Sequence, residues 1–121
     1  MNISSNSFER LQEIFPSEAE SIVRLEGFLS KPTDSKTAFT FKRIFDTALP
    51  RSYIVLAEIL AELETMKVVQ RSYVVVSDDG LSLGTFPNFL SVPPRIRDDE
   101  KECDVAVTRA NLEVRYKVTG L

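Results

Sequence analysis

The sequence predicts an α+β fold, with helices in the first half of the chain and β-strands in the second. In residues 51–66 apolar side chains recur every three or four positions, which is typical of an amphipathic helix. From residue 68 to 76 the apolar residues are β-branched or aromatic, which favours a strand. Turn signals and alternating apolar residues then continue to residue 118. We therefore expect three to four N-terminal helices followed by a C-terminal antiparallel β module of four to five short strands.

The N-terminal third predicts two helices. Residues 1–7 are polar and serine-rich, so we expect them to be frayed. Apolar residues at spacings of three and four predict a helix over residues 8–15, which the following proline ends. Ser17 and Glu20 have the spacing of a capping box, which predicts that a second helix opens at residue 18 and runs to about residue 29.

Two more helices are expected before the first strand. Residues 31–34 contain a proline that breaks the second helix, because proline lacks an amide donor and restricts the preceding residue. A shared apolar face predicts a third helix over residues 35–48. Pro50 closes that helix and is well placed before the first turn of the fourth, residues 51–66.

The second half predicts turns and short strands. Residues 77–80 form a turn signal with a glycine, and residues 81–86 are a plausible return strand. The proline-rich segment 86–94 is expected to be a loop whose apolar residues pack underneath it. The acidic run 97–104 is expected to be a solvated turn. Two last strands are expected about the turn at residues 108–111.

Composition limits the classes of protein to consider. With 121 residues and 43% hydrophobic content, the chain has enough material for one domain. It contains no run of 18 apolar residues, and its N-terminus lacks the pattern of a signal peptide. We therefore expect a soluble, cytoplasmic protein with no membrane partner. The lone Cys103 cannot form an internal disulfide or, alone, a structural zinc site.

The absence of histidine argues against catalysis. It removes Ser-His and Cys-His nucleophile pairs, histidine general bases and the commonest ligand for transition metals. The sequence also lacks a phosphate-binding glycine loop, convincing paired carboxylates and the residue spacing of a calcium loop. We expect no enzymatic activity, no cofactor and no bound metal. The net charge of −3 disfavours a dominant nucleic-acid footprint.

The stretch LAEILAELETMKVVQRSYVVV, residues 56–76, resembles the last helix and first wing strand of bacterial winged-helix proteins. In those families the turn between helix and strand often holds glycine, and here it holds Met66 or Lys67. The rest of the chain, residues 74–118, looks like a zinc-ribbon hairpin that has lost its metal. The resemblance implies a winged-helix-like domain followed by a degenerate zinc-ribbon-like module, as in bacterial small accessory proteins.

The zinc-ribbon resemblance implies a fold without its metal. The positions that would carry the four cysteines hold Ser77, Asp79, Arg97 and Glu100 or their near neighbours, and only Cys103 lies nearby. These residues cannot form a tetrahedral thiolate site. The resemblance instead implies that apolar packing replaces the metal, through four residues: Phe86, Phe89, Val92 and Ile96.

The two resemblances together imply a division of the chain. Residues 1–76 would form the winged-helix-like helical unit with its first strand. Residues 77–121 would form a β-rich hairpin module packed on that unit, within a single compact domain overall.

DNA binding is one function that a winged helix implies, because its recognition helix normally enters the major groove. The charges of residues 51–66 disfavour this: the helix carries Glu58, Glu62 and Glu64, and no lysine or arginine occurs between Arg51 and Lys67. The residues that could contact DNA lie at the helix start, in the preceding helix and at the base of the wing. They are Lys36, Lys42, Arg43, Arg51, Ser52, Tyr53, Lys67 and Arg71. The alternative interpretation is that these charges form a solvated face.

Protein recognition is the function we expect. Phe86, Phe89, Leu90 and Val92 lie in the proline-rich loop, where a small domain can leave them exposed, and exposed apolar patches mark partner surfaces. The alternative is that they close the core. We predict a small non-enzymatic interaction or adaptor component of a bacterial multi-protein system, for example a defence or effector system, that docks onto a larger protein. A winged-helix DNA-binding regulator is the alternative function.

Overall fold

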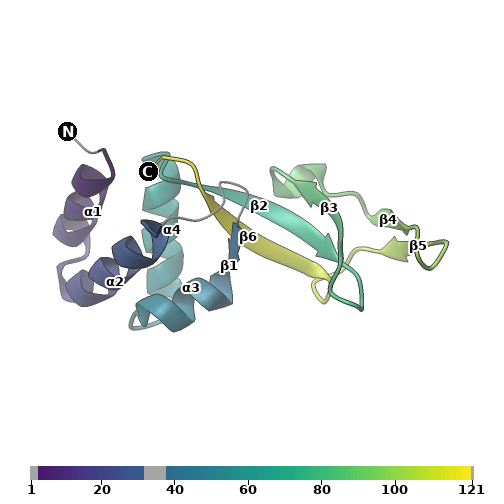
Figure 1. Ribbon diagram of the computed structural model, residues 1–121, viewed down its shortest axis with the longest axis horizontal. Helices are drawn as coiled ribbons and strands as arrows, with labels where there is room; N and C mark the ends of the chain where they lie inside the picture. The colour runs from purple at the N-terminus through teal and green to yellow at the C-terminus, as the bar shows by residue number, and fades with distance from the viewer. Residues whose placement is uncertain (1–2, 32–37, 121) are drawn as a thin grey trace. The chain divides into compact units, whose positions relative to one another are not determined.

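The computed structural model describes residues 3–31 and 38–120 and confirms the α+β class (Figure 1). Within these residues there are four α-helices: α1 (Ile3–Ile14), α2 (Ala19–Leu29), α3 (Phe41–Ala48) and α4 (Tyr53–Thr65). Two short 3₁₀ helices are η1 (Pro16–Glu18) and η2 (Phe89–Ser91). The strands are β1 (Ala38–Thr40), β2 (Val69–Val76), β3 (Ser82–Phe86), β4 (Arg95–Asp98), β5 (Cys103–Ala106) and β6 (Leu112–Val118).

The chain divides into two compact units. The first contains residues 1–70 and 116–121, and the second contains residues 71–115. Strands β2 and β6 each cross the boundary between the units, so in the sequence the second unit is an insertion within the first. The expected division after residue 76 would place all of the last strand with the β-rich part, whereas residues 116–121 belong with the helices.

Helix α1 begins earlier than the periodicity predicts. The expectation that residues 3–7 are frayed is wrong, since α1 starts at Ile3; residues 1–2 lie outside the described part. Ser7, Phe8 and Leu11 are all buried. Burial of two large apolar side chains at the middle of the helix stabilises the turns before them, which propensity alone would leave marginal.

The expected capping box is wrong. Pro16 begins the 3₁₀ helix η1, so Glu18 becomes the residue before α2, and no side chain caps that helix. The Ser17 hydroxyl instead accepts a hydrogen bond from the Arg51 guanidinium at 3.3 Å. Glu20 lies on the helix surface with its carboxylate 3.9 Å from Arg24.

The expected third helix is wrong over its first turns. Residues 38–40 form β1 and α3 begins at Phe41, while residues 35–37 and most of the expected break at 31–34 lie outside the described residues. Thr40 has an extended backbone and its hydroxyl accepts a hydrogen bond from the amide of Arg43 at 3.2 Å, which caps α3. This cap fixes the helix start after the strand rather than within it.

Helix α4 confirms the periodic pattern and supplies much of the core. Its inward residues are fully buried: Leu56, Ile59, Leu60 and Leu63. Burying each such side chain contributes about 1.5–3 kcal/mol. At its C-terminus the amides of Lys67 and Val68 bond the carbonyls of Glu64 and Leu63, both at 2.9 Å, and Lys67 has a positive φ of 62°. This is a Schellman motif, and Lys67 holds the place that usually belongs to glycine.

The larger sheet has the strand order β1-β6-β2-β3. Strands β2 and β6 lie side by side (Figure 1): the amide of Thr119 bonds the Val68 carbonyl at 2.8 Å, and the amide of Val76 bonds the Asn111 carbonyl at 2.7 Å. The two strands expected about the turn at residues 108–111 are present as β5 and β6, but they do not pair with one another: β5 pairs with β4, and β6 lies beside β2. Local alternation predicts a strand but not its partner.

The acidic run is a hairpin rather than a solvated turn. The expectation for residues 97–104 is wrong at both ends, which belong to β4 and β5. Asp98 is buried, and its carboxylate accepts hydrogen bonds from the amides of Glu100 at 3.1 Å and Lys101 at 3.2 Å. A carboxylate that satisfies two turn amides explains why this acidic segment folds locally.

Candidate protein-docking site

The proline-rich loop exposes two of the four apolar residues predicted to recognise protein. Leu90 is 94% exposed and Phe89 is 64% exposed, so the expectation that this loop packs its apolar residues underneath is wrong for both. Phe86 and Val92 are half-buried. The loop therefore presents apolar surface at its tip and uses its flanks for packing.

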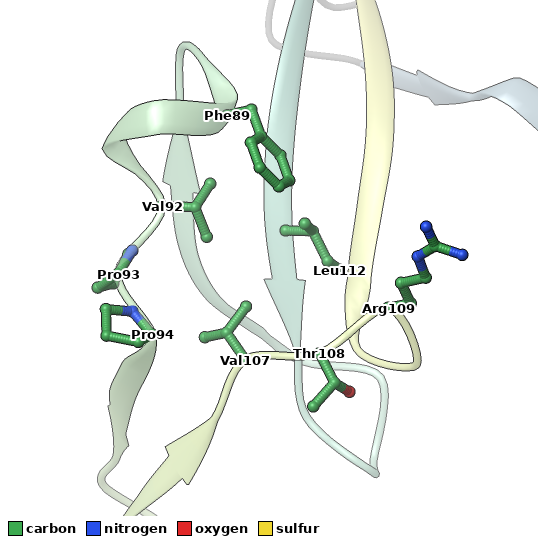
Figure 2. Close-up of a pocket in the computed structure, with 8 residues that line it drawn as sticks. All are labelled: Phe89, Val92, Pro93, Pro94, Val107, Thr108, Arg109 and Leu112. Carbon is green, nitrogen blue, oxygen red and sulfur yellow. The ribbon is translucent and has the colours of Figure 1, made fainter.

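Beside this loop the second unit contains a pocket of about 420 Å³. Eight residues line it: Phe89, Val92, Pro93, Pro94, Val107, Thr108, Arg109 and Leu112. Figure 2 shows Val92 and Leu112 pointing toward one another across the hollow, with the Phe89 ring above them. The volume lies within the range of ligand pockets, and the walls are mainly apolar, as such pockets require.

Side-chain hydrogen bonds hold the two walls of the pocket. On one wall, Asn88 accepts a bond from the amide of Ser91 at 2.9 Å and so fixes η2. On the other wall, Asn111 accepts from the amide of Thr108 at 2.7 Å and donates to the Ala106 carbonyl at 2.9 Å. The amide of Val107 bonds the Pro94 carbonyl at 2.9 Å, which joins the walls. The pocket is preformed, so a ligand would not need to order it.

The rim of the pocket carries one cation. Arg109 is exposed and extends away from the apolar walls (Figure 2). Among the described residues its guanidinium has no ion-pair or hydrogen-bond partner. Of the lining residues only Arg109 is charged, and none is an acid, a base near neutral pH or an activated nucleophile. The site can therefore hold an apolar group beside an anion.

A polar contact outside the pocket joins two turns of the second unit. Lys101 donates a hydrogen bond to the Asp78 carboxylate at 2.9 Å, which links the turn after β2 to the turn between β4 and β5. This hydrogen bond lowers the pKa of Asp78 below its ordinary value, and the same bond raises the pKa of Lys101 above its own. The pair orders the hairpin and lies outside the pocket lining.

Several predicted DNA-contacting residues have partners within the protein. Arg43 places its guanidinium 5.8 Å and 5.5 Å from the ring centres of Phe28 and Phe39. Arg51 lies 3.6 Å from the carboxylate of buried Glu18. These contacts favour structural roles for both arginines.

The remaining predicted DNA contacts are spread over several elements. The Ser52 hydroxyl caps α4 by accepting from the amide of Val55 at 3.2 Å, and Tyr53 stacks on Phe45 with ring centres 4.3 Å apart. Lys42 is exposed on α3 and Lys67 is exposed after α4. Arg71 belongs to the second unit, where its guanidinium lies 5.8 Å from the ring centre of Tyr73. Lys36 lies outside the described residues.

The positions compared with zinc-ribbon cysteines do not form a metal site in the described part of the chain. No group of three or more Cys, Asp or Glu side chains there could hold an ion. Cys103 is exposed in β5, opposite Asp98. Of the four residues expected to replace the metal by apolar packing, Phe86, Val92 and Ile96 are half-buried, whereas Phe89 is mostly exposed.

Comparisons with known proteins find no match to a family model, to a curated protein or to a solved structure. Within residues 3–31 and 38–120, none of the helices is both long enough and apolar enough to cross a membrane.

Proposed function

We propose that this chain is a small non-enzymatic adaptor of a bacterial multi-protein system, and that it acts in the cytoplasm by docking onto a larger protein. The observation that carries this proposal is the preformed apolar pocket beside the exposed Phe89 and Leu90. Its occupant is an extended partner segment that inserts a large apolar side chain and places an aspartate or glutamate beside Arg109.

The chemistry of the pocket supports this occupant. The apolar walls exclude water from one inserted side chain, and burying such a side chain contributes about 1.5–3 kcal/mol. The exposed guanidinium of Arg109 has no ion-pair partner among the described residues, so it can pair with a carboxylate of the partner, and arginine is the residue best suited to that geometry. Aromatic residues and arginines are also the groups that dominate the energy of protein interfaces.

The order of elements supports the winged-helix assignment of the first unit. Helices α3 and α4 are joined by four residues, 49–52, as in a helix-turn-helix. The long strands β2 and β6 follow, with β1 beside β6 in the sheet. On this assignment the second unit stands in the chain order where the wing hairpin would stand, and this unit contains the pocket.

A selection from a displayed peptide library on the immobilised full-length chain tests the proposal. We expect enriched peptides to carry an aromatic or leucine side chain next to an acidic residue. Arg109→Glu should lower the affinity for a selected peptide at least about tenfold, as expected for loss of a charge-assisted pair worth about 1.4 kcal/mol or more. Replacing the peptide's acidic residue by lysine should restore binding to Arg109→Glu.

The matched control is Leu81→Glu, which changes an exposed apolar residue of the same unit that does not line the pocket. It should bind the selected peptide as the natural chain does. If no motif is enriched, or if Arg109→Glu binds it equally well, the pocket is not the docking site and the proposal fails.

The DNA-binding alternative is tested on the same protein with a labelled duplex at two salt concentrations. A regulator would bind with an affinity that falls steeply as salt rises, because it releases counterions from phosphates. Arg51→Ala would then abolish binding. Such an outcome would replace the adaptor function by that of a winged-helix DNA reader.

A further inference from the structure

Helix α4 has an exposed face that the core does not need. We define this α4 face by six exposed residues: Tyr53, Ile54, Ala57, Glu58, Ala61 and Thr65. These residues recur at helical spacings of three and four, so they form one stripe along the helix. Ile54 is 72% exposed and Tyr53 is 62% exposed.

The α4 face is apolar although the opposite side of the helix already fills the core. Leu56, Ile59, Leu60 and Leu63 are at most 1% exposed, which is sufficient to hold a surface helix. A surface helix is expected to turn polar residues outward, whereas Ile54, Ala57 and Ala61 are apolar and exposed. Ile54 in particular is 72% exposed and takes no part in this core.

Tyr53 is fixed in position at one end of the α4 face. Its ring lies 4.3 Å from that of Phe45 and 6.0 Å from that of Phe41, centre to centre. A held aromatic ring loses little entropy on binding, which is the property of an interface anchor. Ala57 and Ala61 are small, so the axis of a second helix can approach to about 8–10 Å.

The charges of α4 indicate the sign of its partner. Glu58 and Glu62 are one helical turn apart, and no lysine or arginine occurs from Ser52 to Met66. Like charges at this spacing repel one another and destabilise a helix. Within the described part of the chain neither carboxylate has an ion-pair partner. Lysine or arginine from another molecule would relieve this repulsion.

We infer that the α4 face docks an amphipathic helix of a partner protein, with an apolar stripe flanked by lysine and arginine. Phosphate groups are repelled by the glutamates, so nucleic acid does not suit this face. A second copy of the chain would bring four glutamates together without a basic residue of α4 to pair with them. The charge pattern therefore selects a basic helix over both alternatives.

Binding of a designed helical peptide to the full-length chain tests this inference. The probe is a peptide of about 15 residues with leucines at helical spacing flanked by lysines, and its matched partner carries glutamates in place of the lysines. The natural chain should bind the lysine peptide at least about tenfold more tightly, a difference of about 1.4 kcal/mol. The double substitution Glu58→Lys with Glu62→Lys should reverse this preference.

The substitution Ile54→Glu tests the apolar contact of the α4 face. It should lower the affinity for the lysine peptide at least about tenfold, although it adds a charge that attracts the lysines. Circular dichroism checks that the variant keeps its helices, and Leu81→Glu in the other unit should bind as the natural chain does. Equal binding of both peptides, or unchanged binding by Ile54→Glu, would overturn the inference.

Self-association is the remaining outcome. If the natural chain sediments as a dimer and Ile54→Glu sediments as a monomer, a second copy covers the α4 face and the inference is wrong. The two proposals can fail independently. The pocket is expected to bind acidic peptides, and the α4 face is expected to bind basic ones.

Discussion

Lys67 occupies a left-handed position that usually holds glycine. Its φ of 62° follows α4, where its amide and that of Val68 close the helix end. The sequence locates this turn to Met66 or Lys67, because the helical pattern stops there and the strand begins at once. It does not reveal the left-handed residues Leu49 and Glu102, since neither residue type indicates a positive φ.

Lys67→Gly should raise the free energy of unfolding by about 0.5–1 kcal/mol, because glycine adopts a left-handed backbone without a steric cost. Urea denaturation of the full-length chain measures this. Ala61→Gly, an exposed substitution inside α4, should lower the free energy of unfolding by about 1 kcal/mol. If Lys67→Gly instead lowers the free energy of unfolding, the lysine side chain stabilises the fold by more than its left-handed backbone destabilises it.

The contact between Lys101 and Asp78 predicts a pH dependence. The depressed pKa of Asp78 stabilises the fold above the ordinary aspartate pKa, and this contribution is lost as pH falls through the lowered value. The raised pKa of Lys101 stabilises the fold below the ordinary lysine pKa, and this is lost as pH rises through the raised value. Lys101→Met should therefore raise the pKa of Asp78 in an NMR titration. An unchanged pKa would show that the contact does not persist in solution.

The C-terminal end of β6 depends on Gly120. The amides of Thr119 and Gly120 both bond the Val68 carbonyl, at 2.8 Å and 3.1 Å. A Cβ at Gly120 would overlap the carbonyl oxygen of Lys67. Gly120→Ala should therefore lower the free energy of unfolding by about 1–3 kcal/mol, as forced overlap does in packed sites.

The control for this change is Gly27→Ala, because Gly27 lies in α2 and a Cβ there meets nothing within 4 Å. It should stabilise the chain by up to about 1 kcal/mol through helix propensity. Thermal unfolding compares the two. Equal effects of both substitutions would contradict the close approach of the chain end to Lys67.

Helices were more predictable than strand partners. The periodicity of Leu56 to Leu63 predicts α4 because its cause lies within one segment. Strand β1 was missed, since three residues carry no pattern and their pairing with β6 is remote in sequence. The pairing of Ile96 with Val105 in the β4–β5 hairpin was not predicted for the same reason. The acidic residues between them are typical of a turn, so the pattern indicated a turn over the whole segment.

At the scale of the whole molecule, only part of the candidate site was predictable. The proline-rich loop pointed to Phe89 and Val92, and both line the pocket. The other wall, residues 107–109 and Leu112, was not predicted, because it depends on the pairing of β5 with β4 and on the hydrogen bonds of Asn111. The pocket and the α4 face lie in different units and differ in charge.

The wall held by Asn111 can be loosened without changing the lining. Asn111→Ala removes bonds to the Thr108 amide and the Ala106 carbonyl, so the wall should lose its fixed shape. We expect a peptide selected on the pocket to bind about fivefold to twentyfold more weakly, from one or two neutral hydrogen bonds. Isothermal titration measures this. Unchanged affinity would mean that the ligand does not use this wall.

In the proposed function the pocket receives an apolar side chain next to a carboxylate. An NMR titration of the isotopically labelled chain with a peptide from the library selection tests this. We predict that amide shifts gather in residues 89–95 and 107–112, and that they vanish for the same peptide on Arg109→Glu. Shifts that gather elsewhere, or that persist unchanged in Arg109→Glu, would contradict the claim.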